Sequence, residues 1–360
     1  MKRKHIRVCM FPERLALNES IGLMSDAIMA NNKVKIFNYS YFFSFFRRAD
    51  IFHVHWPDGT LFGVHWPKHL VKLAFFLSYV FLCKALRRPI VWTVHNIGAH
   101  ESDYPRIERY LWDVFLPRVA WAIHLCPASL EAIKRLTTNV PPGSVIPHPH
   151  YRFVYSPLRR STDPRSLLGY ASDTFVVSSF GLIRPYKGFE DLIRLFRNWR
   201  TENVRLHISG QAMFPTIAVE LQTLAADDDR ISLDLRDLPP QELSDLVQAS
   251  NVIVLPYNKI MNSGVAAAAL SIGTPIIGPA GGCILDYSEK LGAEWVLMFK
   301  DKLTIAHLED AKIRFGRRET RGSPNLSWMD PDKIGEQIVQ VYERLLVEAK
   351  SMKNELSGKS

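Results

Sequence analysis

The sequence has 360 residues, 47% hydrophobic and 22% charged, which excludes a disordered chain and favours two globular domains over one. Residues 1–160 contain 22 lysines and arginines against 10 aspartates and glutamates, and the net charge of the whole chain is +9. A basic first half indicates an anionic partner, such as a membrane, a nucleic acid or an anionic substrate, or else a solvated surface without such a role.

Short apolar strands alternate with helical segments in the first half of the chain. The expected strands cover residues 5–10, 34–37, 51–56, 90–94 and 121–125. A helix over residues 18–30 is indicated by the helical spacing of Ile21, Met24, Ala27 and Ile28. This alternation is typical of βαβ units that build a parallel sheet.

The same pattern starts again in the second half. The expected strands cover residues 174–180, 204–208, 231–234, 252–255 and 275–277. Residues 140–173 are rich in proline, arginine and serine and read as a linker, and a last helix begins at Pro331. The sequence therefore predicts an α/β protein with doubly wound domains over residues 1–160 and 170–330, followed by a helix over residues 331–350.

Two segments of the first half combine apolar and basic residues. Residues 41–48 place four phenylalanines beside Arg47 and Arg48, and residues 73–83 form an apolar run between Lys72 and Lys84. The run is too short to span a bilayer. It is expected to pack on the sheet, or alternatively to dip into a membrane interface with basic residues on lipid phosphates.

The four cysteines indicate a reducing compartment. They are far apart and form no CxxC pair, which argues against a disulfide framework and against a cysteine-held metal. The stretch that follows the basic N-terminus, residues 6–11, is too short for the core of a signal peptide and contains Arg7. We therefore expect a cytoplasmic protein.

A glycine-rich basic loop follows the first strand of the second half. Gly181 lets the backbone approach a ligand closely, while Arg184 and Lys187 place two positive charges before the next helix. Gly210 ends the following strand in the same way. A diphosphate fits this combination of charges, amides and helix dipole. The alternative is an ordinary basic loop.

A second loop points to the same chemistry. It contains Asn262, Ser263 and Gly264 directly before a helix that ends at Gly273. Serine and glycine at a helix start leave amides that can bind phosphate. Two anion sites in one domain match the two phosphates of a nucleotide sugar.

These two loops and their spacing resemble the donor domain of the family 4 glycosyltransferases and their relatives. The resemblance covers residues 170–300, and the first half matches in layout, with His95 where that group has a sugar-contacting histidine. It implies that Lys187 and Arg184 hold the donor diphosphate. It also implies a GT-B fold: two Rossmann-like domains facing a cleft, with the last helix crossing back to the first domain.

The sequence departs from that group at two positions. The family has two glutamates eight residues apart around the second loop, and counting back from Gly273 places them at Ile260 and Ala268. Neither residue can bind a ribose or a sugar hydroxyl, which favours inversion over retention of the anomeric configuration. In this departure the chain resembles bacterial exopolysaccharide mannosyl- and glucuronosyltransferases of GT-B fold, some of which invert.

An inverting reaction needs a base in the first domain. Candidates follow the third and fourth strands, because ligands bind at the carboxyl ends of parallel strands. We expect His95, Glu101 and Asp58 to be catalytic, and His53, His55, His100 and His148 to contact the acceptor or line the cleft. A structural, hydrogen-bonded role is the alternative for any single histidine.

No metal or organic cofactor is expected. His53 and His55 share a strand face without an acidic cluster, and the aspartates at 227–229 follow no strand. The first strand is not followed by GxGxxG.

The sequence therefore predicts a glycosyltransferase of bacterial polysaccharide synthesis. The expected donor is GDP-mannose or a UDP-sugar, and the expected acceptor is an oligosaccharide linked to a polyprenyl diphosphate. The enzyme would be peripheral on the inner face of the cell membrane, bound to anionic lipid. The alternative is a GT-B protein that binds nucleotide sugars but has altered catalysis. Nucleic acid is not an expected partner, because no RRM, KH or helix-turn-helix motif is present.

Overall fold

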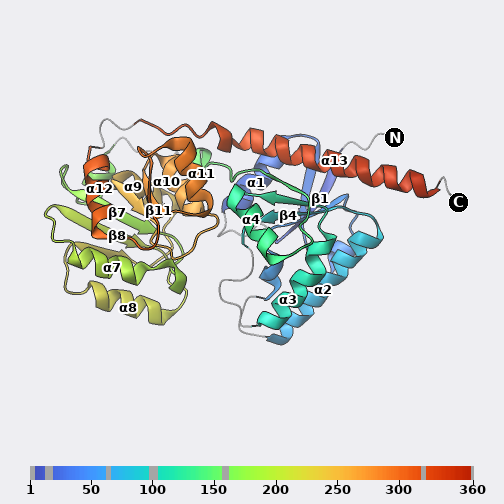
Figure 1. Ribbon diagram of the computed structural model, residues 1–360, viewed down its shortest axis with the longest axis horizontal. Helices are drawn as coiled ribbons and strands as arrows, with labels where there is room; N and C mark the ends of the chain where they lie inside the picture. Colours follow the sequence, from blue (N-terminus) through green and yellow to red (C-terminus); the bar gives the residue numbers. More distant parts are fainter. Residues whose placement is uncertain are drawn as a thin grey trace. The chain divides into compact units, whose positions relative to one another are not determined.

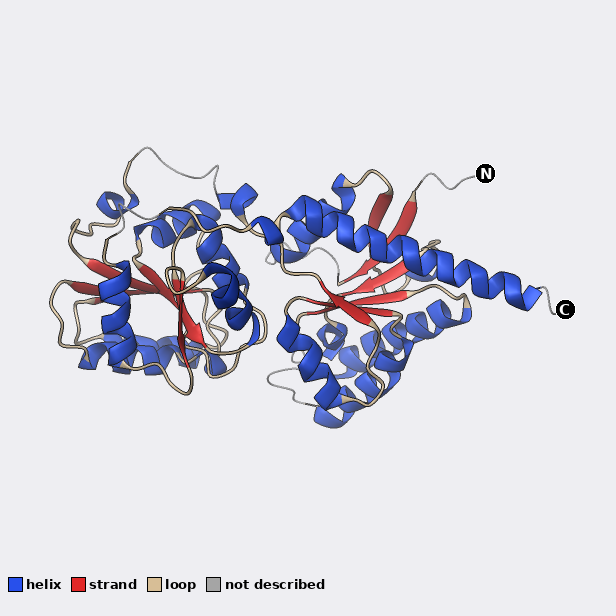
Figure 2. Ribbon diagram, turned by 45° about the horizontal axis from the view of Figure 1, so that its top comes forward, coloured by secondary structure: helices blue, strands red, loops and turns tan. Residues whose placement is uncertain are grey.

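The computed structural model describes residues 5–12, 19–61, 66–96, 104–155, 162–317 and 322–357. The chain divides into two compact units. The first contains residues 1–149 and 328–360, and the second contains residues 150–327. Each unit has a six-stranded parallel sheet between layers of helices (Figures 1 and 2). The predicted pair of Rossmann-like units is therefore confirmed.

The sheet of the first unit has the order β2-β1-β3-β4-β5-β6. After β1, the chain adds β2 on one side of β1 and then adds β3 and the later strands on the other side. A topological switch point therefore lies between β1 and β3. Ligands of doubly wound sheets bind at the carboxyl ends of the strands at such a point. The strands are β1 (Ile6–Phe11), β2 (Val34–Asn38), β3 (Ile51–Val54), β4 (Ile90–Val94), β5 (Trp121–His124) and β6 (Gly143–Val145).

Helices cover both faces of this sheet. On one face, aliphatic strand residues such as Val8 and Ile123 pack with α1 and with α13. On the other face, the rings of Phe52 and Phe76 lie 6.0 Å apart, joining β3 to α2. The helices are α1 (Glu19–Ala30), α2 (Trp66–Ala85), α3 (Pro105–Phe115), α4 (Pro127–Leu136) and α13 (Pro331–Ser357), with short 3₁₀ turns η1 (Phe43–Phe45), η2 (Pro57–Leu61), η3 (Leu116–Arg118) and η6 (Ser327–Met329).

The last helix, α13, belongs to the first unit although it follows the second in sequence. It lies beside α1 (Figure 1). Ile334, Ile338 and Tyr342 are buried in the same core as β1 and α1. Burial of this stripe fixes the helix, because most of a helix's stability in a protein comes from packing its apolar face.

The sheet of the second unit has the order β12-β11-β10-β7-β8-β9, with its switch point between β7 and β10. Its strands are β7 (Phe175–Phe180), β8 (Val204–Ser209), β9 (Ile231–Asp234), β10 (Val252–Val254), β11 (Ile276–Pro279) and β12 (Val296–Phe299). Its helices are α5 (Arg152–Tyr155), α6 (Pro164–Leu167), α7 (Phe189–Asn198), α8 (Pro215–Ala225), α9 (Pro240–Ala249), α10 (Gly264–Ile272), α11 (Gly282–Leu291) and α12 (Ile305–Phe315), with the 3₁₀ turn η5 (Pro185–Lys187).

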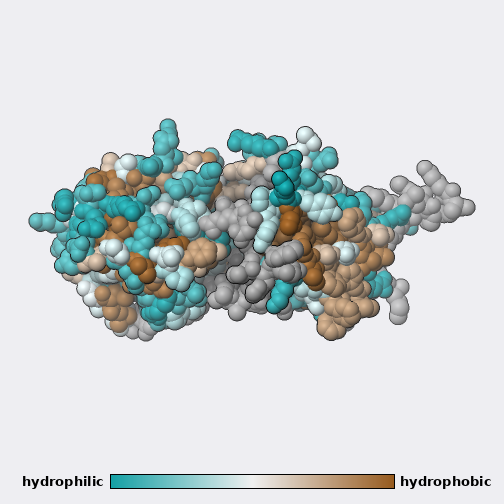
Figure 3. Space-filling model, turned by 90° about the horizontal axis from the view of Figure 1, so that it is seen from below, coloured by the Kyte–Doolittle hydropathy of each residue, from teal (hydrophilic) through white to brown (hydrophobic). Residues whose placement is uncertain are grey.

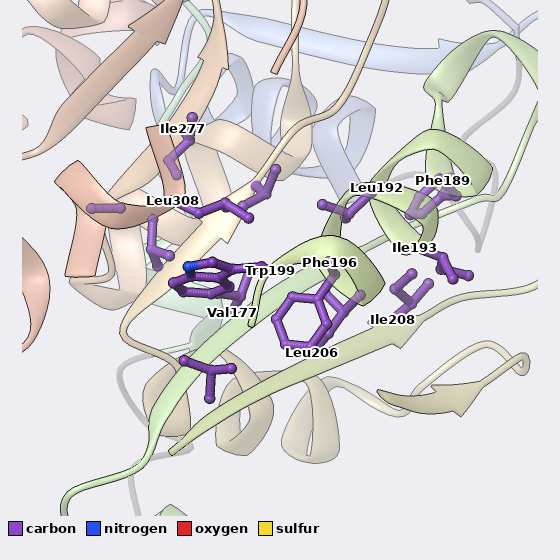
Figure 4. Packing of buried hydrophobic residues seen from close by; sticks show 14 of the residues in the cluster. Val177, Phe189, Leu192, Ile193, Phe196, Trp199, Leu206, Ile208, Ile277 and Leu308 are labelled. Carbon is purple, nitrogen blue, oxygen red and sulfur yellow. The ribbon is translucent and has the colours of Figure 1, made fainter. Parts of the chain in front are cut away.

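One apolar cluster holds this second unit together. Phe189, Ile193 and Phe196 of α7 pack with strand residues that include Val177 and Leu206 (Figure 4). The spacing of these helix residues puts them on one side of α7. The cluster anchors α7, whose N-terminus follows the basic loop, so it holds that loop at the edge of the sheet.

Two strands were not predicted. Strand β6 has only three residues, GSV, and lies inside the segment that reads as a linker. Strand β12, VLMF, is four residues long and follows the turn after Gly292. Such short strands are stabilised by pairing with a neighbour more than by their own pattern. In the described part of the chain, no helix combines the length and apolarity needed to cross a membrane.

Candidate functional site

The basic loop leaves β7 at the switch point of the second sheet. Backbone hydrogen bonds attach it to the loop after β8: the Ile183 amide donates to the Gln211 carbonyl at 2.9 Å, and the Met213 amide donates to the Ile183 carbonyl at 2.9 Å. Arg184 and Lys187 therefore lie on a loop that is hydrogen-bonded to the loop after β8.

Glycines allow three loops to meet at this edge. Gly210 has φ +141, and a Cβ there would overlap the carbonyl oxygen of Gly181. Gly188 has φ +67, and a Cβ there would overlap the carbonyl oxygen of Pro256. The loops after β7, β8 and β10 can approach this closely only because these positions lack side chains.

The two cations of the loop do not pair with any described carboxylate. Among the described residues, neither Arg184 nor Lys187 forms an ion pair. Removal from water, and secondly the nearby Arg184, lower the pKa of Lys187 to about 8. The Lys187 ammonium lies 5.3 Å from the centre of the Tyr257 ring. Lys187 is thus a desolvated cation beside a second one, with no described carboxylate to pair with, and an anion would complete this arrangement.

The start of α10 adds hydrogen-bond donors to the same edge. The Ser263 hydroxyl accepts a hydrogen bond from the Ala266 amide at 3.1 Å and caps the helix. The first turn of a helix carries amides without intrahelical partners and the positive end of the dipole. Gly264 begins this turn and Asn262 precedes the cap. The predicted second loop is thus a helix N-terminus suited to an anion.

No carboxylate occupies the two positions where the resembling family has glutamate. Ala268 is buried within α10, and Ile260 is half-buried in the loop before it. Ribose or sugar hydroxyls at this edge would need other partners.

In the first unit, His53 lies on β3 next to the switch point and is fully buried. Its Nδ1 is 2.5 Å from the Tyr342 hydroxyl of α13, and its Nε2 is 2.7 Å from the Thr93 hydroxyl of β4. Burial, and secondly His55, lower the pKa of His53 well below its usual value. His53 is therefore neutral and held at both ring nitrogens.

A second pair of histidines continues this cluster. The His55 ring stacks on His53 at 4.6 Å, and His55 Nδ1 is 2.9 Å from His95 Nε2. Trp56 stacks on His95 with ring centres 4.1 Å apart. Burial lowers the pKa of His55 to about 3 and that of His95 well below the usual range, and His148 contributes to both shifts. The four imidazoles are held uncharged.

Asp58 lies in η2, just after β3, and is also buried. Removal from water, with a smaller contribution from Glu108, raises its pKa to about 6. Its Oδ2 has no hydrogen-bond partner among the described residues. A carboxyl with this pKa is close to the ideal for proton transfer near neutrality.

The structure thus brings the predicted His53, His55, His95 and His148 together in the first unit. It also brings Gly181, Arg184, Lys187 and Gly210 together with the α10 N-terminus in the second. His100 and Glu101 lie outside the described residues. Within the described part of the chain, no three His, Cys, Asp or Glu side chains are placed to hold a metal ion.

Two residues of these clusters were missed. Tyr342 fits the apolar stripe of the last helix, and nothing in the sequence marks its hydroxyl as a partner of His53. Thr93 lies two residues before His95, in the buried strand β4, and its pattern is that of an ordinary β-branched strand residue. Only the packing of α13 and β4 against β3 identifies them.

No protein-family model matches the chain. A curated protein of Xanthomonas campestris pv. campestris, GDP-mannose:glycolipid 4-beta-D-mannosyltransferase, is 29% identical over 303 residues, which are 84% of this chain and 80% of that protein. Sucrose-phosphate synthase of Thermosynechococcus elongatus matches in structure with a TM-score of 0.65 and 15% identity, covering 99% of this chain and 100% of its own. Anabaena HepE in complex with UDP and glucose matches with a TM-score of 0.61 and 15% identity, again over 99% and 100%.

Replacement of Lys187 tests the anion site. We expect Lys187→Ala to weaken binding of GDP about ten- to a hundredfold, since a charge-assisted contact contributes roughly 1.5–3 kcal/mol. Isothermal calorimetry at pH 7 measures this directly. Arg194→Ala removes an exposed charge from α7 and serves as the matched control. Wild-type affinity in Lys187→Ala would show that the loop does not hold the phosphates.

Proposed function

We propose that this chain, a glycosyltransferase with the GT-B fold, transfers mannose from GDP-mannose to a glycolipid. The solved structures confirm the predicted fold, and the Xanthomonas relative confirms the predicted enzyme class. Donor and acceptor in the proposal are those in the relative's name. The proposal is carried by the pair of cations after β7, which form no ion pair with any carboxylate in the described part of the chain.

Arg184, Lys187 and the start of α10 act on the donor diphosphate in this proposal. As the bond between sugar and phosphate breaks, negative charge develops on the departing phosphate oxygen. Preorganised cations and helix amides stabilise that charge without having to reorient during the reaction. The same groups bind the donor in its ground state, so their loss lowers both affinity and rate.

The acceptor in the proposal is an oligosaccharide linked to a polyprenyl diphosphate, as used in bacterial polysaccharide synthesis. The glycolipid in the relative's name and the basic first half of this chain support it. Lipid diphosphate and basic surface are complementary in charge.

Inversion of configuration is part of the proposal. The apolar Ile260 and Ala268 leave no carboxylate at the positions of the family glutamates. The relative's name specifies a β-linked product. In the proposal this product is formed from GDP-mannose with its sugar in α-linkage. Direct displacement by an acceptor hydroxyl reverses the configuration and requires a base for the hydroxyl proton.

Asp58 is the base that we favour among the candidates. Its pKa of about 6 keeps it ionised at neutral pH while leaving it more basic than an ordinary carboxylate. His95, with its pKa lowered well below the usual value, is a weaker base.

Product analysis tests the function. Purified protein, a bacterial lipid extract and a panel of GDP- and UDP-sugars should yield a mannosylated lipid from GDP-mannose alone. Proton NMR of the product should show a β-mannosidic linkage. An α-linkage would contradict inversion, and a UDP-sugar as the better donor would contradict the donor assignment. Binding of GDP-mannose without any transfer would instead favour a protein with altered catalysis.

The pH dependence of kcat/KM tests the base. The base is active as a carboxylate, so kcat/KM should fall about tenfold per pH unit below about pH 6, as Asp58 becomes protonated. Asp58→Asn should lose about 10²–10⁴-fold in kcat and lose this acid limb. Asp50→Asn is the matched control: Asp50 is buried in the same unit but pairs with Arg7 at 3.3 Å. It should keep the pH profile. An unchanged kcat in Asp58→Asn would exclude this residue as the base.

A surface of the first unit supports membrane binding. Phe42, Phe43 and Phe46 are 59%, 62% and 76% exposed, and they precede Arg47 and Arg48. The ring of Phe45 lies 6.2 Å from Phe75 of α2, which joins the aromatic segment to this helix.

The helix continues the same surface. Its outer side exposes Val71, Phe75 and Phe81, and Arg87 follows its end. Figure 3 shows hydrophobic atoms gathered on this unit, in the right half of the view. Exposed aromatics next to arginines are typical of peripheral binding to anionic lipid. We place the enzyme on the cytoplasmic face of the membrane, where a lipid-linked acceptor is presented.

Vesicle co-sedimentation tests this surface. The protein should pellet with vesicles containing phosphatidylglycerol, less so at high salt, and should stay in solution with purely zwitterionic vesicles. Replacing Arg47, Arg48 and Arg87 by serine should weaken binding about a hundredfold or more, at about 1 kcal/mol per charge. The control replaces exposed Lys300, Lys302 and Arg314 of the second unit. Equal recovery with both kinds of vesicle at low salt would remove the membrane from the proposal.

A further inference from the structure

The histidine cluster raises a question that fold and enzyme class leave open: which nitrogen of each ring carries the proton. A neutral imidazole has one N–H donor and one acceptor nitrogen, and the choice decides whether the ring can donate to a substrate or accept from it. The hydrogen bond between His55 and His95 links the two choices, since one ring must donate and the other accept.

His55 has one hydrogen-bond partner. Its Nδ1 faces His95 Nε2 at 2.9 Å, while its Nε2 is buried and has no partner among the described residues. The residue as a whole is 1% exposed, so bulk solvent does not reach this nitrogen. The proton of neutral His55 is therefore either on Nδ1, which is hydrogen-bonded to His95, or on Nε2, which has no described partner.

The two protonation forms of His55 differ in free energy. With the proton on Nε2, the N–H would be buried without an acceptor among the described residues. Such a group is rare in folded proteins because the donor loses its hydrogen bond to water. With the proton on Nδ1, the N–H is used and only an acceptor lone pair remains unpaired, which is better tolerated. A doubly protonated ring is excluded by burial, which keeps the pKa of His55 near 3.

We propose that His55 is a positioning residue that donates from Nδ1 to His95 Nε2 and thereby fixes His95 as a neutral ring with its proton on Nδ1. His95 Nε2 is then occupied as an acceptor and cannot take a proton from a substrate. His95 acts as a hydrogen-bond donor through Nδ1–H. Its catalytic meaning rests on the proposed function, because the proton of the acceptor hydroxyl must then go to another group.

The rest of the cluster holds this arrangement in place. His53 is bound at both nitrogens by Tyr342 and Thr93, and its ring stacks on His55 with an angle of 22° between the planes. On the far side, Trp56 stacks on His95. The hydroxyl of Tyr342 thus connects α13 to the orientation of His55 through one intervening ring.

Long-range ¹H–¹⁵N NMR of histidine-labelled protein tests the inference at pH 7 without ligand. The ¹⁵N shifts distinguish Nδ1–H, Nε2–H and doubly protonated rings, and signals are assigned with His55→Asn and His95→Gln. We expect Nδ1–H for both His55 and His95. An Nε2–H form of either ring, or a charged ring, would overturn the inference.

Two replacements of His55 separate positioning from packing. The amide nitrogen of Asn stands where Nδ1 does, so His55→Asn should keep the donor and leave His95 in the Nδ1–H form. Leucine fills the space without a donor, so in His55→Leu the His95 signals should shift toward a mixture of tautomers. The same His95 signature in both variants would show that His55 only packs.

Activity distinguishes this inference from the proposed function. The NMR result needs no donor or acceptor, so absence of mannosyl transfer would leave it standing. Conversely, transfer from GDP-mannose together with an Nε2–H form of His95 would keep the function and overturn the inference.

Discussion

Two positive charges at the edge of the second unit's sheet form no ion pair with any described carboxylate. Lys187 and Arg184 stand on one loop, out of reach of any described carboxylate, and removal from water already weakens the protonation of Lys187. Keeping such a pair is unfavourable unless a ligand supplies negative charge. Gly188 and Gly210 let the flanking loops close around it, and the capped start of α10 adds amides. This is the arrangement on which the proposed donor site rests.

The first unit has mostly uncharged groups at its switch point, in contrast to the cations of the second unit. Its switch point is lined by imidazoles that burial keeps neutral, and by Asp58, whose ionisation is delayed to about pH 6. Neutral donors and acceptors suit sugar hydroxyls, which carry no charge but form directional hydrogen bonds. The proposed division follows from these environments: charged groups of one unit act on the phosphates, and neutral groups of the other act on hydroxyls and protons.

Much of this architecture could be predicted from the sequence, because buried parallel strands have a strong local signal. The two-residue period of a strand places His53 and His55 on one face, and their rings do stack. The basic loop is recognisable because glycine, arginine and lysine are close in sequence. The short β6 and β12 could not be predicted, since pairing with neighbours stabilises them.

Other features depend on distant parts of the chain. The partner of His53 is Tyr342, 289 residues away, so no local pattern reveals it. The raised pKa of Asp58 arises from burial among η2, α2 and α3, and its sequence neighbours give no sign of it. Glu101 follows a predicted strand in the sequence, and it lies outside the described residues, so its catalytic role stays a prediction.

Proton uptake on nucleotide binding tests the central claim about the two cations most directly. With its pKa at about 8, Lys187 is about half protonated at pH 8 in the free protein, and phosphate would hold it fully charged. Calorimetry of GDP-mannose binding at pH 8, in two buffers of different ionisation enthalpy, should show uptake of about half a proton. Lys187→Arg, charged at all these pH values, should abolish the uptake. Binding without proton uptake in the wild type, or the same uptake in Lys187→Arg, would contradict the claim that the phosphates meet this lysine.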